Sequence, residues 1–170
     1  LGNVGLYMAA CRRHEIADPS REKQSSLPEA STLAMQIGAS IGMIPRFATA
    51  HLTTHNKAEN GYYRRFTDLK CEKLFFFFIT KGILAYKRAA DALLRILPLG
   101  ISHPLAEDLL TVAAQALKDV IVSNRILFTE LSVDEFFYQV RPYYKPHFVG
   151  PQLYRGANAG DFAGINVIDM

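Results

Sequence analysis

The sequence predicts an all-α fold. Three observations predict it: apolar residues recur at helical spacing along the chain, helix start and stop signals separate the periodic segments, and the alternation typical of strands is missing except near 148–153. The chain has 170 residues, of which 49% are hydrophobic and 21% charged, so it is long enough to bury one core. We therefore expect residues 1–170 to form a single helical domain.

A loop and two helical patterns are predicted before residue 60. The Ser- and Pro-rich segment 18–28 is typical of a surface loop. At its end Ser26 and Glu29, with a proline between them, fit a capping box. A helix should then run over 29–41 with apolar residues four apart, and a further helical pattern begins over 47–52.

Two long helices are predicted in the middle of the chain. The first should run over about 69–97, where Pro98 and a following glycine end it. The second begins after 102–104 and carries an apolar stripe over 105–121 in a rhythm of three and four residues. Stripes of this kind predict that each helix buries one face.

The last part of the chain should contain two shorter helices. Ser132–Glu135 fits a second capping box, and Pro142 should end the helix that it opens. A brief extended piece is expected over 148–153. Residues 161–170 are typical of the first turns of an amphipathic helix with Asp161 as its N-cap. Because its apolar face needs a partner, we expect the chain to be a C-terminally truncated fragment.

Composition excludes several classes of function. The net charge of +3 is weak and the basic pairs are scattered, so no nucleic-acid partner is expected. The longest apolar run, Leu74–Ile79, is six residues long, far short of the roughly 20 needed to span a bilayer. Cys11 and Cys71 lie apart and are typical of reduced core thiols. These features predict a soluble, cytoplasmic protein without a membrane partner.

The segment 132–162 carries the most specific chemistry. It places Arg141 near the end of a short helix with an aromatic face, and a small-residue loop, Gly156–Gly160, follows. A guanidinium beside exposed backbone N–H groups can hold a carboxylate or a propionate. The alternative is that Arg141 is an ordinary arginine at a helix C-terminus, where it favours the dipole and covers the core with its stem.

Phe136–Tyr144 is followed by Lys145–Pro146 and by Val149–Gly150. This run resembles the haem-dependent aromatic oxygenases, the superfamily of indoleamine 2,3-dioxygenase, and most closely its PrnB-like branch of monodechloroaminopyrrolnitrin synthases. Weaker similarity extends upstream to Met43–Arg46 and Thr53–Asn56. The resemblance implies a helical bundle of the indoleamine 2,3-dioxygenase type, incomplete at its C-terminus. The chain would then be the N-terminal part of a larger haem-binding domain with haem b as cofactor.

The resemblance also implies residue roles. Arg141 matches the arginine that binds the substrate carboxylate, and Asn158 to Gly160 match a loop that touches substrate and haem propionate. The long helix with its four phenylalanines matches the wall on the far side of the haem. The implied substrate contacts are Arg141, Phe136, Ala159, Phe75 and Phe76, and the implied haem contacts are Asn158, Gly160 and Ala157.

No iron ligand is predicted in this chain. The family's axial histidine lies well beyond the small-residue loop and is expected past Met170. Of the five histidines present, His51 and His55 are spaced i, i+4, which is also a metal-ligand spacing, but no third ligand is evident. No other metal site is predicted.

The resemblance implies a haem-dependent oxygenase that acts on tryptophan or a related aromatic amino acid with dioxygen. This chain alone, without the axial histidine, should be inactive. The alternative is a non-catalytic all-α domain, or inactive fragment, that binds a partner protein through exposed apolar surface.

Overall fold

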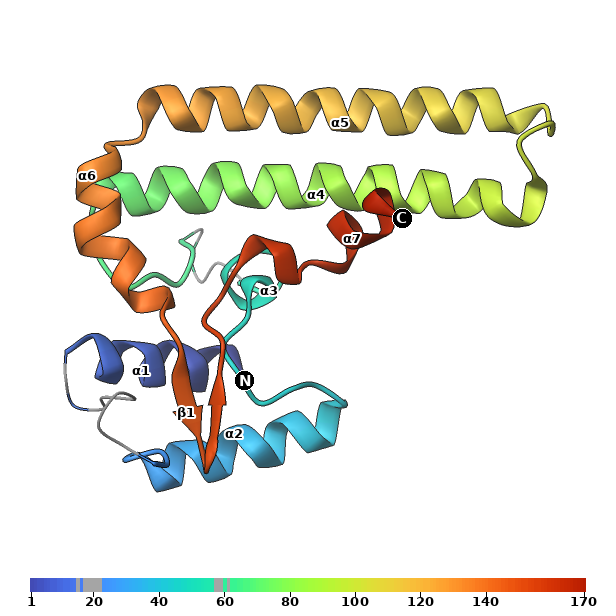
Figure 1. Ribbon diagram of the computed structural model, residues 1–170. Coiled ribbons are helices and arrows are strands. Elements are labelled where there is room, and N and C mark those ends of the chain that lie inside the picture. The colour runs from blue at the N-terminus through green and yellow to red at the C-terminus, as the bar shows by residue number, and fades with distance from the viewer. Residues whose placement is uncertain (15, 17–22, 57–59, 61) are drawn as a thin grey trace.

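The described part of the chain is helical apart from one short hairpin in the computed structural model (Figure 1). The structure describes residues 1–14, 16, 23–56, 60 and 62–170, with the side chain of Ala159 outside the described part. The predicted all-α class is confirmed. The elements are, in order, α1 (Gly2–Arg13), α2 (Pro28–Ile41), α3 (Thr49–Leu52), α4 (Lys70–Leu99), α5 (Leu105–Glu130), α6 (Val133–Glu135), η1 (Phe136–Val140), η2 (Arg141–Tyr144), β1 (His147–Val149), β2 (Gln152–Tyr154), η3 (Ala159–Asp161) and α7 (Ala163–Asp169).

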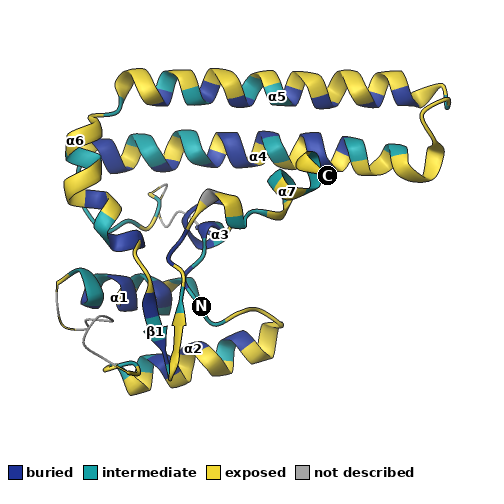
Figure 2. Cartoon of the chain, in the orientation of Figure 1, coloured by how far each residue is buried: buried dark blue, intermediate teal, exposed yellow. Residues whose placement is uncertain are grey.

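The helices α4 and α5 run antiparallel, side by side, and form a long arm (Figure 1). Small residues of both helices, Ala89 and Ala92 on one and Ala113 and Ala116 on the other, make their shared core. Because alanines leave little side chain between two helices, the backbones can approach closely. The buried residues of α5 lie on the side that faces α4, and the opposite side is exposed (Figure 2). Near its C-terminal end, α7 packs Ile168 against the same core.

A second lobe contains α1, α2 and the hairpin (Figure 1). Its core joins Met8 of α1, Ala34 of α2 and Val149 of β1. The strands β1 and β2 are antiparallel, with Val149 opposite Gln152, and Gly150 turns the chain between them with φ of 59°. The extended piece expected over 148–153 is thus confirmed as a hairpin.

The main core lies where α1, the α3 region, α4 and η1–η2 meet. Its buried residues include Phe47, Phe76, Val140 and Tyr143, and the ring of Phe66 stacks on that of Tyr143 at 4.3 Å between centroids. Val140 and Tyr143 flank Arg141 in sequence. The core therefore fixes the backbone of the segment that carries Arg141.

Three predicted helix ends are wrong in detail. The capping box at Ser26 does not form, because Leu27 is the N-cap of α2 and its N–H is bound by Ser25 Oγ at 3.1 Å. Pro98 is tolerated inside the last turn of α4, where Gly100 N–H still reaches the carbonyl of Ile96 at 2.8 Å. Asp161 is not a helix N-cap, since Phe162 has that place in α7.

Two predictions about the class of protein can be compared with the structure. In the described residues no helix combines the length and apolarity that a bilayer crossing needs. Cys11 and Cys71 are both free and buried, so the prediction of reduced core thiols is confirmed.

Candidate functional site

The small-residue loop lies directly against the turn that follows Arg141. A Cβ placed on Gly156 would come within 1.6 Å of the carbonyl oxygen of Tyr144, so no side chain fits there. Ala157, next in the loop, is buried in the main core. The two segments that the sequence singled out, 141–144 and 156–160, are therefore in contact.

Arg46 anchors this loop from the other side. Its Nη1 donates to the carbonyl oxygen of Arg155 at 3.2 Å, and its Nη2 lies 2.9 Å from Oδ2 of Asp161. Both side chains of the ion pair are only 15% exposed, so the pair is shielded from solvent. Thr49 Oγ1 adds a hydrogen bond to the carbonyl of Asn158. The loop is thus fixed at both ends and in the middle.

A small cavity lies at this junction, between the α3 region, α4, η2 and the loop. Its volume is about 40 Å³, which is room for about one water molecule. Three of the predicted site residues line it: Phe75, Ala157 and Asn158. The other lining residues are Thr49, Leu52, Thr53, Ile79 and Tyr144.

Aromatic rings form one wall of the junction. Phe136 and Phe75 are half-buried and their ring centroids lie 4.5 Å apart, with Tyr144 6.0 Å from Phe75. Phe76 is different: it is 1% exposed in the main core, and it does not line this cavity. Of the two phenylalanines predicted on α4, the structure places Phe75 at the junction and Phe76 away from it.

Tyr144 is a functional candidate that the sequence analysis missed. Its hydroxyl is buried without a hydrogen-bond partner in the described structure, and burial raises its pKa well above the ordinary value. A buried polar group of this kind needs a partner, which a ligand or water can supply. The only signal was its place directly after the Arg-Pro-Tyr run, where an aromatic is more often core.

Arg141 is exposed at the start of η2. Its side chain forms no ion pair or hydrogen bond with any residue that the structure describes, and it does not line the small cavity. Burial raises the pKa of Tyr144, and the positive charge of Arg141 opposes this rise in part. The helical turn before it, η1, is a π-helix, a rare form found often at functional sites.

The rest of the loop is at the surface. The side chain of Asn158 is exposed and its Oδ1 accepts a hydrogen bond from Gly160 N–H at 2.9 Å. Gly160 is also exposed. The prediction for Ala159 as a substrate contact falls on a side chain outside the described residues.

Neither His51 nor His55 lines the small cavity. His51 is buried, which lowers its pKa to about 4, and its Nδ1 accepts the N–H of Ala48 at 3.0 Å, so it is neutral. His55 lies past the end of α3 and is exposed. No cluster of three metal-ligating side chains occurs among the described residues. The exposed loop and Arg141 fit the anionic edge of a haem, and the half-buried phenylalanines fit an apolar face, but none of these residues is an iron ligand.

The comparison with known families agrees with this arrangement. A family model described as Monodechloroaminopyrrolnitrin synthase PrnB matches residues 1–170. The chain belongs to the PrnB family. The resemblance of its C-terminal segment is thereby confirmed over the whole sequence, including the weakly similar upstream part. The PrnB family is one of haem enzymes with oxygenase-type function on aromatic substrates. Among curated proteins none matches the chain significantly.

Proposed function

We propose that this chain forms the substrate-carboxylate side of a haem-dependent oxygenase that acts on tryptophan or a related aromatic amino acid with dioxygen. The observation that carries the proposal is the junction of the two predicted segments, where Gly156 meets the carbonyl of Tyr144 beside a cavity. This contact joins the backbone of the turn that follows Arg141 to the small-residue loop, beside the buried hydroxyl of Tyr144.

In this proposal Arg141 holds the substrate carboxylate. A guanidinium presents a planar fork of donors that matches a carboxylate, and Arg141 has no protein partner among the described residues that would compete. Phe136 and Phe75 take the aromatic ring, since two tilted rings 4.5 Å apart offer a flat apolar wall. Ala159 contacts the substrate through the same loop.

Substrate binding has to widen the cavity, because an indole ring is much larger than one water molecule. Phe75 and Phe136 are the side chains that can move, since both are only half-buried. Tyr144 Oη then gains the polar partner that it lacks. Binding should therefore order this wall of the molecule.

The exposed loop would hold the cofactor's edge. Asn158 and Gly160 are exposed and offer backbone groups and one amide side chain, and Ala157, which is buried, supports them from the core. When bound, the haem supplies dioxygen activation, and the residues of this chain orient the substrate and exclude water from it.

The proposal is tested by calorimetry of L-tryptophan with haem-loaded protein. Arg141→Ala should weaken tryptophan binding at least tenfold. Tryptamine lacks the carboxylate, so it should bind the unmutated protein about as weakly as tryptophan binds Arg141→Ala. Arg95→Ala is the matched control, because Arg95 is also exposed and lies near the C-terminal end of α4, whereas the junction lies beside Phe75 and Ile79 near the start of this helix. Unchanged binding by Arg141→Ala would remove the carboxylate role.

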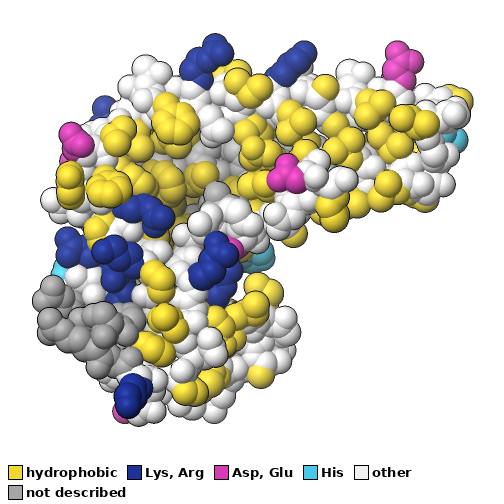
Figure 3. Space-filling model, viewed as in Figure 1, with side chains coloured by type: hydrophobic (Ala, Val, Ile, Leu, Met, Phe, Trp, Pro, Cys, Tyr) yellow, Lys and Arg dark blue, Asp and Glu magenta, His cyan; other side chains and the backbone are white. Residues whose placement is uncertain are grey.

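A second candidate, a non-catalytic domain that binds a protein partner, is favoured by the surface of the arm. Figure 3 shows hydrophobic side chains spread over the face of α4 and α5 that is turned to the viewer. Leu97, Ile101 and Phe128 are 76%, 77% and 75% exposed. Stoichiometric haem uptake by the full-length protein, followed by the Soret band, supports the oxygenase, whereas absence of uptake by the full-length protein favours this second candidate.

A further inference from the structure

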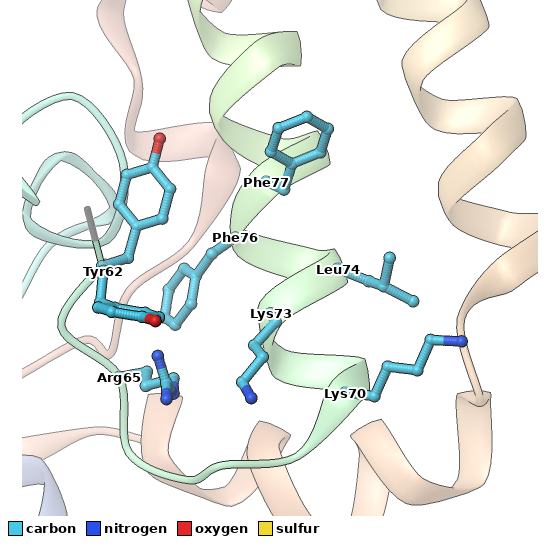
Figure 4. Close-up of a pocket in the computed structure, with 8 residues that line it drawn as sticks. Tyr62, Arg65, Lys70, Lys73, Leu74, Phe76 and Phe77 are labelled. Atoms are coloured by element: carbon cyan, nitrogen blue, oxygen red, sulfur yellow. The ribbon is translucent and has the colours of Figure 1, made fainter. Parts of the chain in front are cut away.

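A second and larger cavity lies between the first turns of α4 and the extended segment 62–68 that leads into it (Figure 4). Its volume is about 350 Å³, within the range typical of small-molecule sites. Phe76 lines it, whereas the preceding Phe75 lines the small cavity beside the loop. Successive helix residues point about a quarter turn or more apart, so α4 separates the two cavities.

One side of this cavity is aromatic. Tyr62, Tyr63, Phe76 and Phe77 contribute rings, and Leu74 adds to the apolar lining. Phe76 is fully buried and forms the floor, while Tyr62 and Phe77 are exposed at the mouth. Flat rings on several sides favour a flat apolar ligand over a hydrated inorganic ion.

The other side is cationic. Arg65, Lys70 and Lys73 all line the cavity, and no acidic residue is among the described lining residues. Figure 4 shows Arg65 and Lys73 directed into the same space, with Lys70 extending along the far rim. Neither lysine forms an ion pair with a described residue. The ammonium groups of Lys70 and Lys73 are therefore available to bind an anionic group.

Arg65 is held in position for this role. Its Nε donates to the carbonyl of Thr67 at 2.9 Å and its Nη2 to Asp68 at 2.5 Å, which leaves Nη1 without a partner among the described residues. Asp68 itself points to solvent with 90% of its side chain exposed. The guanidinium carbon of Arg65 also lies 5.9 Å from the centre of the Tyr62 ring, and this cation–π contact helps to hold the guanidinium in place.

A buried carboxylate fixes the wall that carries Arg65. Glu72 Oε1 accepts the N–H of Phe66 at 2.8 Å, and Oε2 accepts the N–H of Thr67 at 2.6 Å. The hydroxyl of Thr67 donates to the same oxygen. The segment 65–67 is thus tied to α4 before any ligand arrives, and a preorganised site loses less entropy on binding.

We propose that this cavity binds a small aromatic carboxylate, with its ring among Tyr63, Phe76 and Phe77 and its carboxylate between Arg65 and Lys73. The aromatic walls disfavour phosphate or sulfate alone, and Lys70 and Lys73, which have no acidic partner among the described residues, disfavour a positively charged ring. Charge-assisted hydrogen bonds from Nη1 of Arg65 and Nζ of Lys73 hold the carboxylate. The site is distinct from the junction of Arg141 and the loop.

The test is fluorescence titration of the 170-residue chain with 2-naphthoate, compared with the neutral 2-naphthamide. We expect the amide to bind at least tenfold more weakly. Lys73→Glu should weaken naphthoate binding at least tenfold, which corresponds to about 1.4 kcal/mol or more. Lys118→Glu on α5 changes the net charge equally at an exposed site outside the cavity and should have little effect. Tyr62→Ala, also at an exposed residue, should weaken binding without unfolding the chain.

Several results would overturn the proposal. An equal loss of naphthoate affinity in Lys73→Glu and Lys118→Glu would show that binding depends only on the net charge of the chain. Equal affinity for 2-naphthamide and 2-naphthoate would show that the carboxylate is not recognised. Displacement of naphthoate by phosphate at similar concentration would show a plain anion site. Naphthoate binding that is lost in Arg141→Ala but kept in Lys73→Glu would place the probe at the junction instead, so failure of this site and failure of the proposed oxygenase site can be told apart.

Discussion

Gly156→Ala tests the contact between the loop and the turn that follows Arg141. The added Cβ would lie 1.6 Å from the oxygen and 2.4 Å from the carbon of the Tyr144 carbonyl, and 2.8 Å from the carbonyl carbon of Lys145. All three are backbone atoms, so no side-chain rotation relieves the clash. The loop or η2 has to move, and Ala157 leaves its place in the core. We expect a loss of about 2–3 kcal/mol in the free energy of unfolding, the upper part of the range for overpacking.

Urea unfolding followed by circular dichroism measures this loss. The matched control is Gly82→Ala in α4, where an added Cβ meets no atom within 4 Å. Alanine is the better helix former, so that control should gain about 0.5–1 kcal/mol. If Gly156→Ala unfolded at the same urea concentration as the unmutated chain, the loop could not lie against Tyr144 as described, and the site would lose its basis.

Two further predictions concern buried titratable groups. Burial raises the pKa of Glu72, so the contribution of Glu72 to stability should fall as pH rises through that raised pKa. Glu72→Gln should remove this pH dependence. It should also lower the free energy of unfolding by about 1–3 kcal/mol, because the glutamine amide cannot accept all three hydrogen bonds. Burial lowers the pKa of His147 from 6.5 to about 4, so the unfolded chain binds more protons and stability should fall by about 3 kcal/mol as pH drops through that window. His147→Gln should reduce the difference between the free energies of unfolding measured with urea at about pH 7 and about pH 4.5. An unchanged difference would show that another group causes the loss of stability.

The helices were predictable from the sequence because their signals are local. The expected ranges 29–41 and 69–97 agree with α2 and α4 to within two residues at each end. Apolar spacing, proline and glycine are enough to set such limits. Cap details were less predictable: Ser26 was expected to bind the N–H of Glu29, whereas the observed side-chain bond runs from Leu27 N–H to Ser25 Oγ.

Long-range electrostatics were not predictable. The pair of Arg46 and Asp161 joins positions far apart in sequence, and helix-start chemistry suggested a local role for the aspartate. Glu72, in the first turn of α4, has the pattern of a solvated charge that favours the helix dipole, but it is fully buried and binds the preceding segment. Only the packing of that segment on α4 shows the difference.

The candidate site was partly predictable. Arg141 and the loop were singled out from residue chemistry and the Arg-Pro-Tyr-Tyr run from the family resemblance, and the structure brings the backbones of the run and the loop together at Gly156. Among four consecutive phenylalanines, however, periodicity cannot decide which one faces which cavity. Phe75 and Phe76 line different cavities, and this follows from the rotation of α4 against its neighbours.

Titration of isotope-labelled, haem-loaded protein with L-tryptophan, followed by NMR, tests the central claim most directly. Binding at the junction should shift the backbone amide signals of Ala157 and Asn158 and the side-chain Nε–H signal of Arg141. Shifts confined to the segment 62–73 would contradict the assignment of the substrate carboxylate to Arg141. The absence of shifts from both regions would contradict it as well.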